Sequence, residues 1–460
     1  MKKMLLFLSL IAIALLITAW RASSKKVPGD DVLVPGYTSK TLNAKVNGSP
    51  LKRVNPYFTV IPYDYYQVTH TARTEVAELI KKLQNVNNLN TLVKKAGNYF
   101  KNRPYNAEGA EGEGDWCTLT QRGCAHIQQD PLYRTDQFDC QTWVQTALAL
   151  INARNINDYE KNILAIEYGA AHTDSIRYYN RNNFISSDFN PVNQASGLLK
   201  DVTNKGVFSS YARKTSALIN RQKWFAYQAK PNLIGENVRV IRNADGLVMY
   251  HRLKNKYPAP FHVFSPETVT IAYVPKETFV KKSVDSKGTV RYQPNLKLIN
   301  QIPTPSVIEI VRDVKQWTMN EKNIKDVIGS ELNVSHLGLL YRDRFPYGST
   351  IFQKITCSKD KAGNKVCSVT PQICRKKTGC IETLFLHATE AYPDGYYYYQ
   401  DAQSHYQCTA KKPAGGTPYT TCNRLLALPL GDYLVNYQYD HYVYLENPAI
   451  LGINIEKILN

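Results

Sequence analysis

Apolar residues in the first third of the chain recur three and four positions apart, which is the spacing of one helix face. This pattern predicts a helical region over residues 71–100, divided into two helices by the asparagine-rich stretch 85–90. It predicts a further amphipathic helix over residues 158–171. Between these regions, in the stretch Phe138–Leu150, a polar turn gives way to an apolar run with Trp143, Val144 and Leu148 at helical spacing. We therefore expect another helix that begins close to residue 140.

The later part of the chain is rich in strand-like runs separated by turn signals. These runs are Val238–Arg242, Thr268–Val274, Ser306–Val311, Val334–Tyr341, Thr383–Thr389 and Asn423–Leu428. The segment 355–381 is polar, basic and cysteine-bearing, and we expect it to be an excursion between strands, not a domain of its own. Because helices come first and strands later, the sequence predicts an α+β fold with an antiparallel sheet.

A cysteine stands at the predicted start of the helix near residue 140. Asp139 is a suitable N-cap, because its carboxylate can accept the free backbone N–H groups of the first turn. Cys140 then lies in that turn, where the helix dipole lowers the pKa of a thiol and favours the nucleophilic thiolate. The alternative is a half-buried cysteine that only packs beneath the helix.

The N-terminus has the composition of an export signal. Lys2 and Lys3 precede an apolar run from Met4 to Trp20, which predicts a signal peptide over residues 1–22. An uncleaved anchor is the alternative, and it is the one membrane contact that we expect. Residues 23–62 are polar and predict a linker or arm.

If the protein is exported, its nine cysteines are expected to form disulfides, because disulfides persist in oxidising compartments. Eight of them form near-neighbour pairs, which predicts the bonds Cys117–Cys124, Cys357–Cys367, Cys374–Cys380 and Cys408–Cys422. Cys140 remains without a pairing partner, and an unpaired thiol in an oxidising compartment suggests a task. A zinc site is the competing idea, but the chain has no C-x-x-C motif. We therefore expect no metal.

The net charge of +19 favours anionic partners, such as a carboxylate-rich bacterial wall polymer. The basic residues are dispersed, without the dense block of a nucleic-acid arm, so we expect no nucleic-acid partner. The chain contains 32 tyrosines, including the run Tyr396–Tyr399. Such residues suit a sugar-contacting surface, although ordinary sheet tyrosines explain them equally well.

Two histidines, His336 and His387, lie on strand-like runs downstream of Cys140. A cysteine hydrolase needs an imidazole beside its thiol and a third group that orients the imidazole. Gly338 shares a strand face with His336 and leaves room above the strand. The alternative is that His336 is only a strand residue.

Several short motifs resemble the NlpC/P60 papain-like superfamily. They are Asp139-Cys140-x-x-Trp143-Val144, His336-Leu337-Gly338-Leu339 and Leu386-His387-Ala388-Thr389. More narrowly, the chain resembles the N-acetylmuramoyl-L-alanine amidase-like branch (DUF1460), through Phe138-Asp139-Cys140-Gln141-Thr142-Trp143, Arg177-Tyr178-Tyr179, Tyr273-Val274-Pro275-Lys276 and Val334-Ser335-His336-Leu337-Gly338. The sequence departs from the branch at Gln145, where glutamate is usual, and in the long separation of the two histidines.

The resemblance implies a papain-like core without a cofactor, in which Cys140 is the nucleophile, His336 the base and His387 the orienting residue. It further implies that Arg177, Tyr178 and Asp139 contact the substrate. The expected domains are a helical region over 63–114 and a cysteine amidase domain over 115–460, with insertions at about 355–381 and 404–424.

The expected activity is hydrolysis of the N-acetylmuramoyl-L-alanine bond of peptidoglycan or muropeptides by an exported bacterial protein, in the periplasm, the envelope or the medium. One alternative is an endopeptidase that cuts γ-D-glutamyl-diaminopimelate. Another is a non-catalytic wall-binding protein or an exported effector with the same fold.

Overall fold

The computed structural model describes residues 63–105, 133–169, 181–221, 223–224, 265–319, 321–389, 397–400, 406–409, 424–435 and 447–459. Several predictions lie outside these residues: the signal segment, the linker, the strand Val238–Arg242, Arg177, Tyr178, and the bonds Cys117–Cys124 and Cys408–Cys422.

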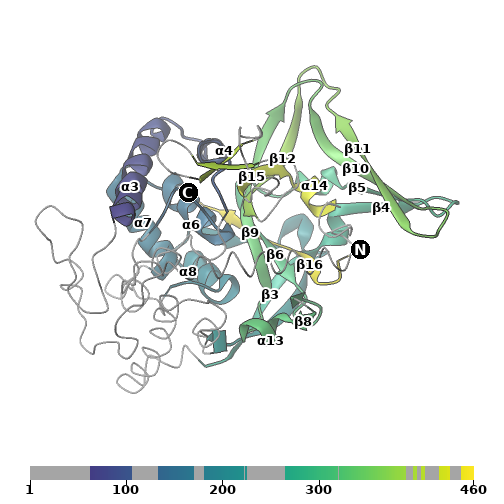
Figure 1. The fold of residues 1–460 in the computed structure, drawn as a ribbon, viewed down its shortest axis with the longest axis horizontal. Helices are drawn as coiled ribbons and strands as arrows, with labels where there is room; N and C mark the ends of the chain where they lie inside the picture. Colours follow the sequence, from purple (N-terminus) through teal and green to yellow (C-terminus); the bar gives the residue numbers. More distant parts are fainter. Residues whose placement is uncertain are drawn as a thin grey trace, which may run out of the picture.

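A large antiparallel sheet forms the centre of the molecule (Figure 1). Its strands follow the order β15 (Arg424–Pro429), β12 (Cys380–Thr389), β9 (Val334–Phe345), β6 (Ser306–Arg312), β16 (Ile450–Ile458), β3 (Glu267–Pro275) and β2 (Arg213–Ile219), with β1 (Leu199–Asp201) also paired to β16. The predicted α+β class with an antiparallel sheet is confirmed.

Helices gather on one side of this sheet in Figure 1: α3 (Tyr63–Leu83), α4 (Leu89–Phe100), α6 (Cys140–Ile151), α7 (Ile156–Tyr168) and α8 (Asn190–Ala195). The predicted division of the first helical region is confirmed, because Asn88 caps α4 by accepting the Thr91 N–H. Gly169, with φ of 80°, ends α7.

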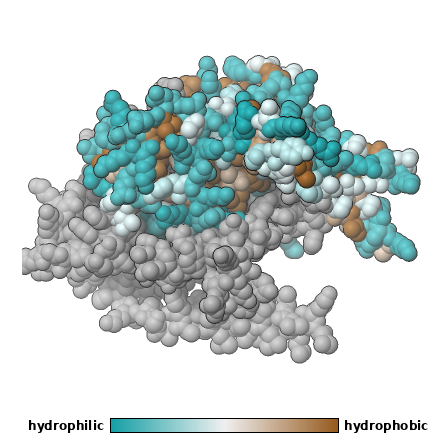
Figure 2. Space-filling model, turned by 90° about the horizontal axis from the view of Figure 1, so that it is seen from above, coloured by the Kyte–Doolittle hydropathy of each residue, from teal (hydrophilic) through white to brown (hydrophobic). Residues whose placement is uncertain are grey.

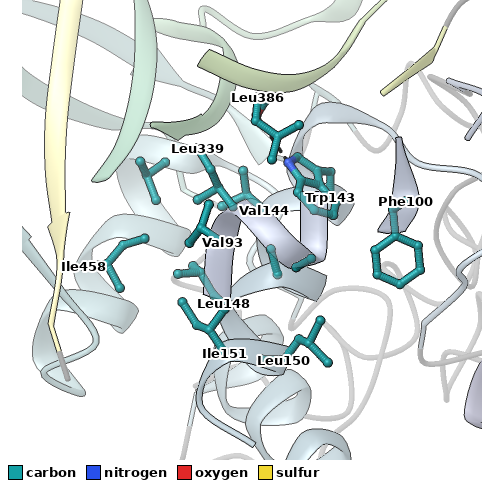
Figure 3. Packing of buried hydrophobic residues seen from close by; sticks show 14 of the residues in the cluster. Val93, Phe100, Trp143, Val144, Leu148, Leu150, Ile151, Leu339, Leu386 and Ile458 are labelled. Carbon is teal, nitrogen blue, oxygen red and sulfur yellow. Dashed lines mark hydrogen bonds between the residues drawn. The ribbon is translucent and has the colours of Figure 1, made fainter. Parts of the chain in front are cut away.

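The helix α6 lies at the centre of the core on this side, and all of its residues from Gln141 to Ile151 are buried. Figure 3 shows Trp143, Val144 and Leu148 of α6 packed among apolar side chains from α4, β9, β12 and β16. The indole of Trp143 meets the rings of Phe100 and Phe138 edge-on, at centroid distances of 6.1 and 5.6 Å. Burying a large side chain contributes about 1.5–3 kcal/mol, so this packing holds α6 firmly against the sheet.

A second sheet, with strand order β11 (Lys365–Ile373), β10 (Thr350–Lys359), β5 (Val290–Pro294) and β4 (Val280–Val284), covers the opposite face of the central sheet together with α14 (Leu430–Val435). Its core residues Tyr292 and Ile355 share one apolar cluster with Leu340 and Phe385 of the central sheet. The expected excursion at 355–381 is therefore a regular hairpin that helps to build a layer. Its inward residues Ile355 and Cys357 alternate with the polar residues Lys354, Thr356 and Ser358, which made the segment look like a polar excursion in the sequence.

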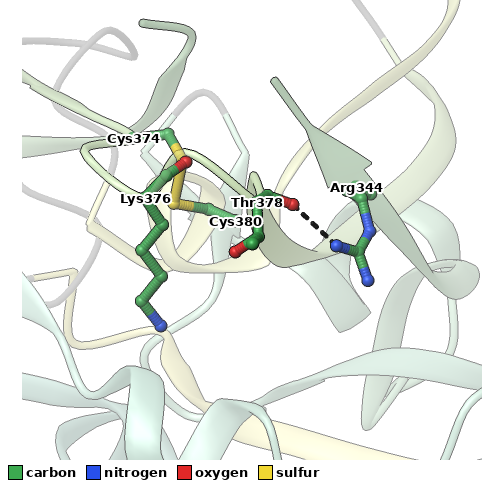
Figure 4. Close-up of a disulfide and its surroundings, with 5 residues drawn as sticks. All are labelled: Arg344, Cys374, Lys376, Thr378 and Cys380. Carbon is green, nitrogen blue, oxygen red and sulfur yellow. Dashed lines mark hydrogen bonds between the residues drawn. A yellow bond between two sulfur atoms is a disulfide. The ribbon is translucent and has the colours of Figure 1, made fainter. Parts of the chain in front are cut away.

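Two predicted disulfides are confirmed within the described residues. Cys357 and Cys367 are directly opposite each other on β10 and β11, with Cα atoms 4.0 Å apart. Cys374–Cys380 closes the loop between β11 and β12, and the Arg344 guanidinium donates to the Thr378 carbonyl beside it at 2.7 Å (Figure 4). The stapled loop is thus also tied to β9.

Shorter elements complete the described chain. They are η3 (Ile185–Phe189), η4 (Gly206–Phe208), η6 (Lys276–Phe279), α12 (Leu296–Ile299), α13 (Ile324–Ile328), β7 (Thr318–Met319), β8 (Lys322–Asn323), β13 (Tyr397–Gln400) and β14 (Tyr406–Thr409). The surface seen in Figure 2 is mostly hydrophilic, with apolar residues in small groups. Among the described helices, none has the length and hydropathy needed to cross a membrane.

Candidate active site

The start of α6 is fixed by local sequence. The Asp139 side chain accepts the Thr142 backbone N–H at 2.7 Å, and the Thr142 hydroxyl accepts the Asp139 backbone N–H at 2.9 Å. This reciprocal capping box places Cys140 at the first helical position, as predicted. It also engages the Asp139 carboxylate within the helix end, so the structure shows a capping role for this residue.

Cys140 lies where two strands of the central sheet separate. The β9–β12 ladder ends at the pair Leu339–Leu386. Beyond that pair the Leu386 carbonyl accepts the Trp143 indole N–H of α6, at 3.3 Å (Figure 3). The Leu337 backbone N–H, on the facing edge of β9, interacts with the Cys140 sulfur. The opening between the strands therefore brings the helix end to the strand that carries His336.

A β-bulge lies directly before His336 in β9. Ile310 of β6 pairs with His336 of β9, and the next residue, Val311, pairs with Val334. Ser335 lies between these two pairs without a partner on β6 and is therefore the extra residue of the bulge. Bulges bend a strand and re-aim its side chains, and they are common next to active sites. Here the extra residue is Ser335, while His336 keeps the same face of β9 as Gly338 and Leu340.

The two histidines predicted from the sequence meet in the structure. His336 Nε2 lies 2.8 Å from His387 Nδ1, and the rings are nearly perpendicular, with centroids 5.0 Å apart. Gly338 makes this approach possible, because a Cβ at that position would lie 2.7 Å from the His387 Cβ. The room above the strand is thus filled by the second histidine.

His387 is fixed by aromatic packing. Its ring is almost fully buried, stacks on Phe385 at 4.6 Å, and meets the ring of Tyr433 from α14 edge-on at 5.1 Å. If Nδ1 of His336 is to accept a proton, its Nε2 must donate to His387 Nδ1, which in turn places the hydrogen of His387 on Nε2. Within the described residues, that buried Nε2 has no hydrogen-bond partner. The dyad is therefore held mainly by stacking and by its own hydrogen bond.

The electrostatics of the site favour neutral groups. Burial, together with the Asp139 carboxylate, raises the pKa of the Cys140 thiol to about 12, although the backbone N–H groups of Leu337, Cys140 and Gln141 oppose the shift. Burial, aided by the Arg312 guanidinium, lowers the pKa of His336 to about 3. The pKa of His387 is also well below its usual value, because of burial and His336.

The expectation of a lowered thiol pKa is thus wrong for the free site. The helix N-terminus does favour the thiolate, but desolvation penalises a buried charge more strongly. Desolvation therefore favours the neutral thiol of Cys140 and the neutral imidazoles of both histidines.

A buried network supports the helix behind the thiol. Arg181 donates to Glu167 at 2.8 Å and to Gln145 at 3.4 Å, and all three side chains are buried. Gln145 is the position where the resembling branch usually has glutamate, and here its amide oxygen accepts from the arginine. Gln141 also donates to the Asn182 carbonyl at 2.6 Å, which joins this segment to the first turn of α6.

Sequence reasoning missed Arg312, the last residue of β6. Its Nε donates to the Ser335 hydroxyl at 2.6 Å, directly beside the base. The sequence did contain a sign of this residue, because Arg312 directly follows the apolar run Ser306–Val311. That run forms the strand that pairs with β9. Among the described residues, no group of histidine, cysteine or acidic side chains can hold a metal ion.

Comparison with solved structures finds proteins that are similar to this chain. A crystal structure of a DUF1460 protein from Legionella pneumophila str. Philadelphia 1 is similar in fold, with a TM-score of 0.51 and 23% identity, covering 86% of this chain and 97% of that one. Two crystal structures of an N-acetylmuramoyl-L-alanine amidase from Bacteroides uniformis match less well, with TM-scores of 0.37 and 0.36 and 15% identity, covering 81% of this chain and 99% of theirs.

Comparison with curated proteins gives no match. The model of the AmiA-like family, described as N-acetylmuramoyl-L-alanine amidase-like, matches residues 95–370, which is more than half of the chain and includes Cys140 and His336. The chain belongs to this amidase-like family.

Proposed function

We propose that the protein is an exported cysteine amidase that hydrolyses the N-acetylmuramoyl-L-alanine bond of peptidoglycan or muropeptides. The observation that carries the proposal is the His336–His387 pair, 2.8 Å apart, on the strand edge where the Cys140 sulfur meets the Leu337 N–H. Membership of the amidase-like family supports the choice of bond. A papain-like NlpC/P60 origin of the core is part of the same proposal.

The reaction begins from neutral groups. As the Cys140 sulfur attacks the lactyl carbonyl carbon, its proton passes to Nδ1 of His336, the ring nitrogen that does not bond His387. Because a free thiolate–imidazolium pair is disfavoured by burial, proton transfer accompanies the attack. The negative charge moves to the carbonyl oxygen, where backbone N–H groups at the start of α6 can stabilise it.

The tetrahedral intermediate then collapses. The imidazolium of His336 gives its proton to the alanine nitrogen, the C–N bond breaks, and the muramoyl group remains as a thioester on Cys140. A water molecule, deprotonated by His336, hydrolyses the thioester and restores the thiol. Throughout, His387 accepts the Nε2 hydrogen of His336 and so holds the ring in one tautomer.

Export belongs to the proposal because of the signal-like N-terminus and the two disulfides of the second sheet and its loop. Disulfides persist in oxidising compartments such as the bacterial periplasm and the exterior. Fractionation of the producing bacterium is the test, and protein confined to the cytoplasm with reduced cysteines would contradict export.

The activity is tested by incubating the purified protein with defined muropeptides and analysing the products by mass. Disaccharide freed of its peptide, absent with Cys140→Ala, is the expected result. Products cut between γ-D-glutamate and diaminopimelate would instead identify an endopeptidase. Binding of muropeptides without any product would indicate a wall-binding protein, and turnover by Cys140→Ala would refute the cysteine mechanism.

A further inference from the structure

Among the residues that the structure describes, Arg312 lies beside the proposed base without a carboxylate partner. Arg312 is half-buried at the end of β6, and its backbone N–H bonds the Asn333 carbonyl at 2.9 Å. Its Nε donates to the Ser335 hydroxyl at 2.6 Å, and its guanidinium lies over the Trp317 ring, 5.3 Å from the centroid. These contacts hold the side chain in place, and no described residue forms a hydrogen bond with either terminal nitrogen.

Several other arginines that are buried or half-buried have carboxylate partners. Arg103, Arg134, Arg181 and Arg221 all form ion pairs. In the part of the chain that the structure describes, no carboxylate pairs with Arg312. A guanidinium that is half-buried and held in place forms strong charge-assisted hydrogen bonds with an anion, so Arg312 suits a ligand that supplies one.

A second cation increases the positive potential at this place. Lys276 is almost fully buried, and its ammonium group donates to the Asn447 carbonyl. Burial lowers the pKa of Lys276 to about 8; the Glu277 carboxylate opposes this shift and Arg312 adds to it. The end of β6 and the segment after β3 therefore bring two cations, Arg312 and Lys276, and one carboxylate, Glu277, near one another.

The position of Arg312 relative to the reaction indicates which part of a substrate it faces. His336 gives its proton to the leaving amine, so the leaving peptide lies on the His336 side of the cleaved bond. Arg312 is on this side, since it bonds Ser335, the residue before the base. The nucleophile and the oxyanion donors lie at the start of α6 instead.

We propose that Arg312, positioned by Ser335 and Trp317, binds a carboxylate of the leaving peptide. The preferred substrates then carry a free carboxylate on the second residue of that peptide, the one after the residue whose nitrogen forms the cleaved amide. This inference rests on the proposed function. In a stem peptide, the α-carboxylate of a γ-linked D-glutamate in second position meets the requirement, and its α-carboxamide does not.

The ion pair would also assist catalysis. Arg312 is one cause of the lowered pKa of His336, and a bound carboxylate neutralises that effect. A substrate with the correct carboxylate therefore makes the base more basic at the moment of reaction. A substrate without it leaves the base weak.

The test uses two muramoyl tripeptides that differ only in a carboxylate or a carboxamide at the second residue. We expect the native protein to prefer the carboxylate by about 10- to 100-fold in kcat/KM, which is typical of one charge-assisted hydrogen-bonded pair. Arg312→Gln should abolish this preference, and Arg312→Lys should retain part of it. Arg291→Gln, which removes an equal charge on β5, should leave the preference unchanged.

If Arg312→Gln still prefers the carboxylate tripeptide, the inference is overturned. It is also overturned if this substitution lowers kcat/KM equally for both tripeptides. If the native protein cleaves neither tripeptide, the proposed function fails while the carboxylate site is still tested. Calorimetry with Cys140→Ala should then give tighter binding of the carboxylate peptide than of the carboxamide. The same difference in the double variant Cys140→Ala, Arg312→Gln would overturn the site.

Discussion

Gly338 is the point at which the fold and the proposed chemistry depend on one another most directly. A Cβ at this position would lie 2.7 Å from the His387 Cβ, 2.7 Å from the Leu386 carbonyl oxygen and 2.7 Å from Phe385 Cε2. Ordinary carbon contacts are about 3.5–4.0 Å, so the substitution Gly338→Ala requires shifts of about 1 Å.

The neighbours have little freedom to make these shifts. Leu386 and His387 belong to β12, which is paired with β15 on its other edge, and the Phe385 ring is fully buried. Overpacking of this kind costs about 1–3 kcal/mol. A displacement of about 1 Å at a catalytic group lowers the rate by about 100-fold, because the hydrogen bond between the histidines is broken.

Thermal unfolding and steady-state kinetics on a muropeptide measure the two effects separately. Gly97→Ala is the matched control, because its Cβ would meet only the flexible tip of the Leu386 side chain, in the core on the helix side. We expect both variants to lose some stability, but only Gly338→Ala to lose kcat. A folded Gly338→Ala protein with the native kcat would refute the need for a glycine beside the dyad.

Three further predictions concern the dyad, the core and the cysteines. His387→Asn places an amide oxygen near the position of the His387 Nδ1, where it can accept the hydrogen of His336 Nε2. This variant should retain much more activity than His387→Leu, whose kcat should fall by about 100-fold or more. Equal activities of the two variants would contradict an orienting role. Burial raises the pKa of Glu309 to about 8, so the folded state binds the proton of this carboxyl more tightly than the unfolded state does. The resulting contribution to the free energy of unfolding is complete below pH 4.5 and disappears as the pH rises through 8. Glu309→Gln should therefore raise the melting temperature more at pH 8 than at pH 5, and a difference independent of pH would exclude this explanation. A thiol count on the native exported protein should give one free thiol, mapped to Cys140; several free thiols would disprove the pairing of the other eight cysteines.

The features that the sequence could predict are those that depend on near neighbours. The cap of α6 needs only Asp139 and Thr142, three residues apart, and the break between α3 and α4 needs only its asparagines. The bond Cys357–Cys367 closes a short hairpin, so the spacing of its cysteines was sufficient. The apolar runs of the sequence predicted five strands of the central sheet, β3, β6, β9, β12 and β15, but not β16 or β2.

The details of the site depend on contacts between distant segments, which a single sequence does not specify. The lowered thiol pKa expected from the helix end was reversed by burial, and burial is known only once the sheets and helices have packed. The second sheet was missed because β4 and β5 are separated from β10 and β11 by more than fifty residues. Arg312 acquired its place beside His336 through strand pairing and a bulge at Ser335.

The sequence by itself therefore determined the identity of the chemical groups and the local elements that carry them. The tertiary structure decided their environment: which face each histidine occupies, how far Cys140 is removed from water, and which charge lies beside the base. The physical reason is that capping and periodicity act over a few residues, whereas desolvation and strand register are properties of the assembled chain.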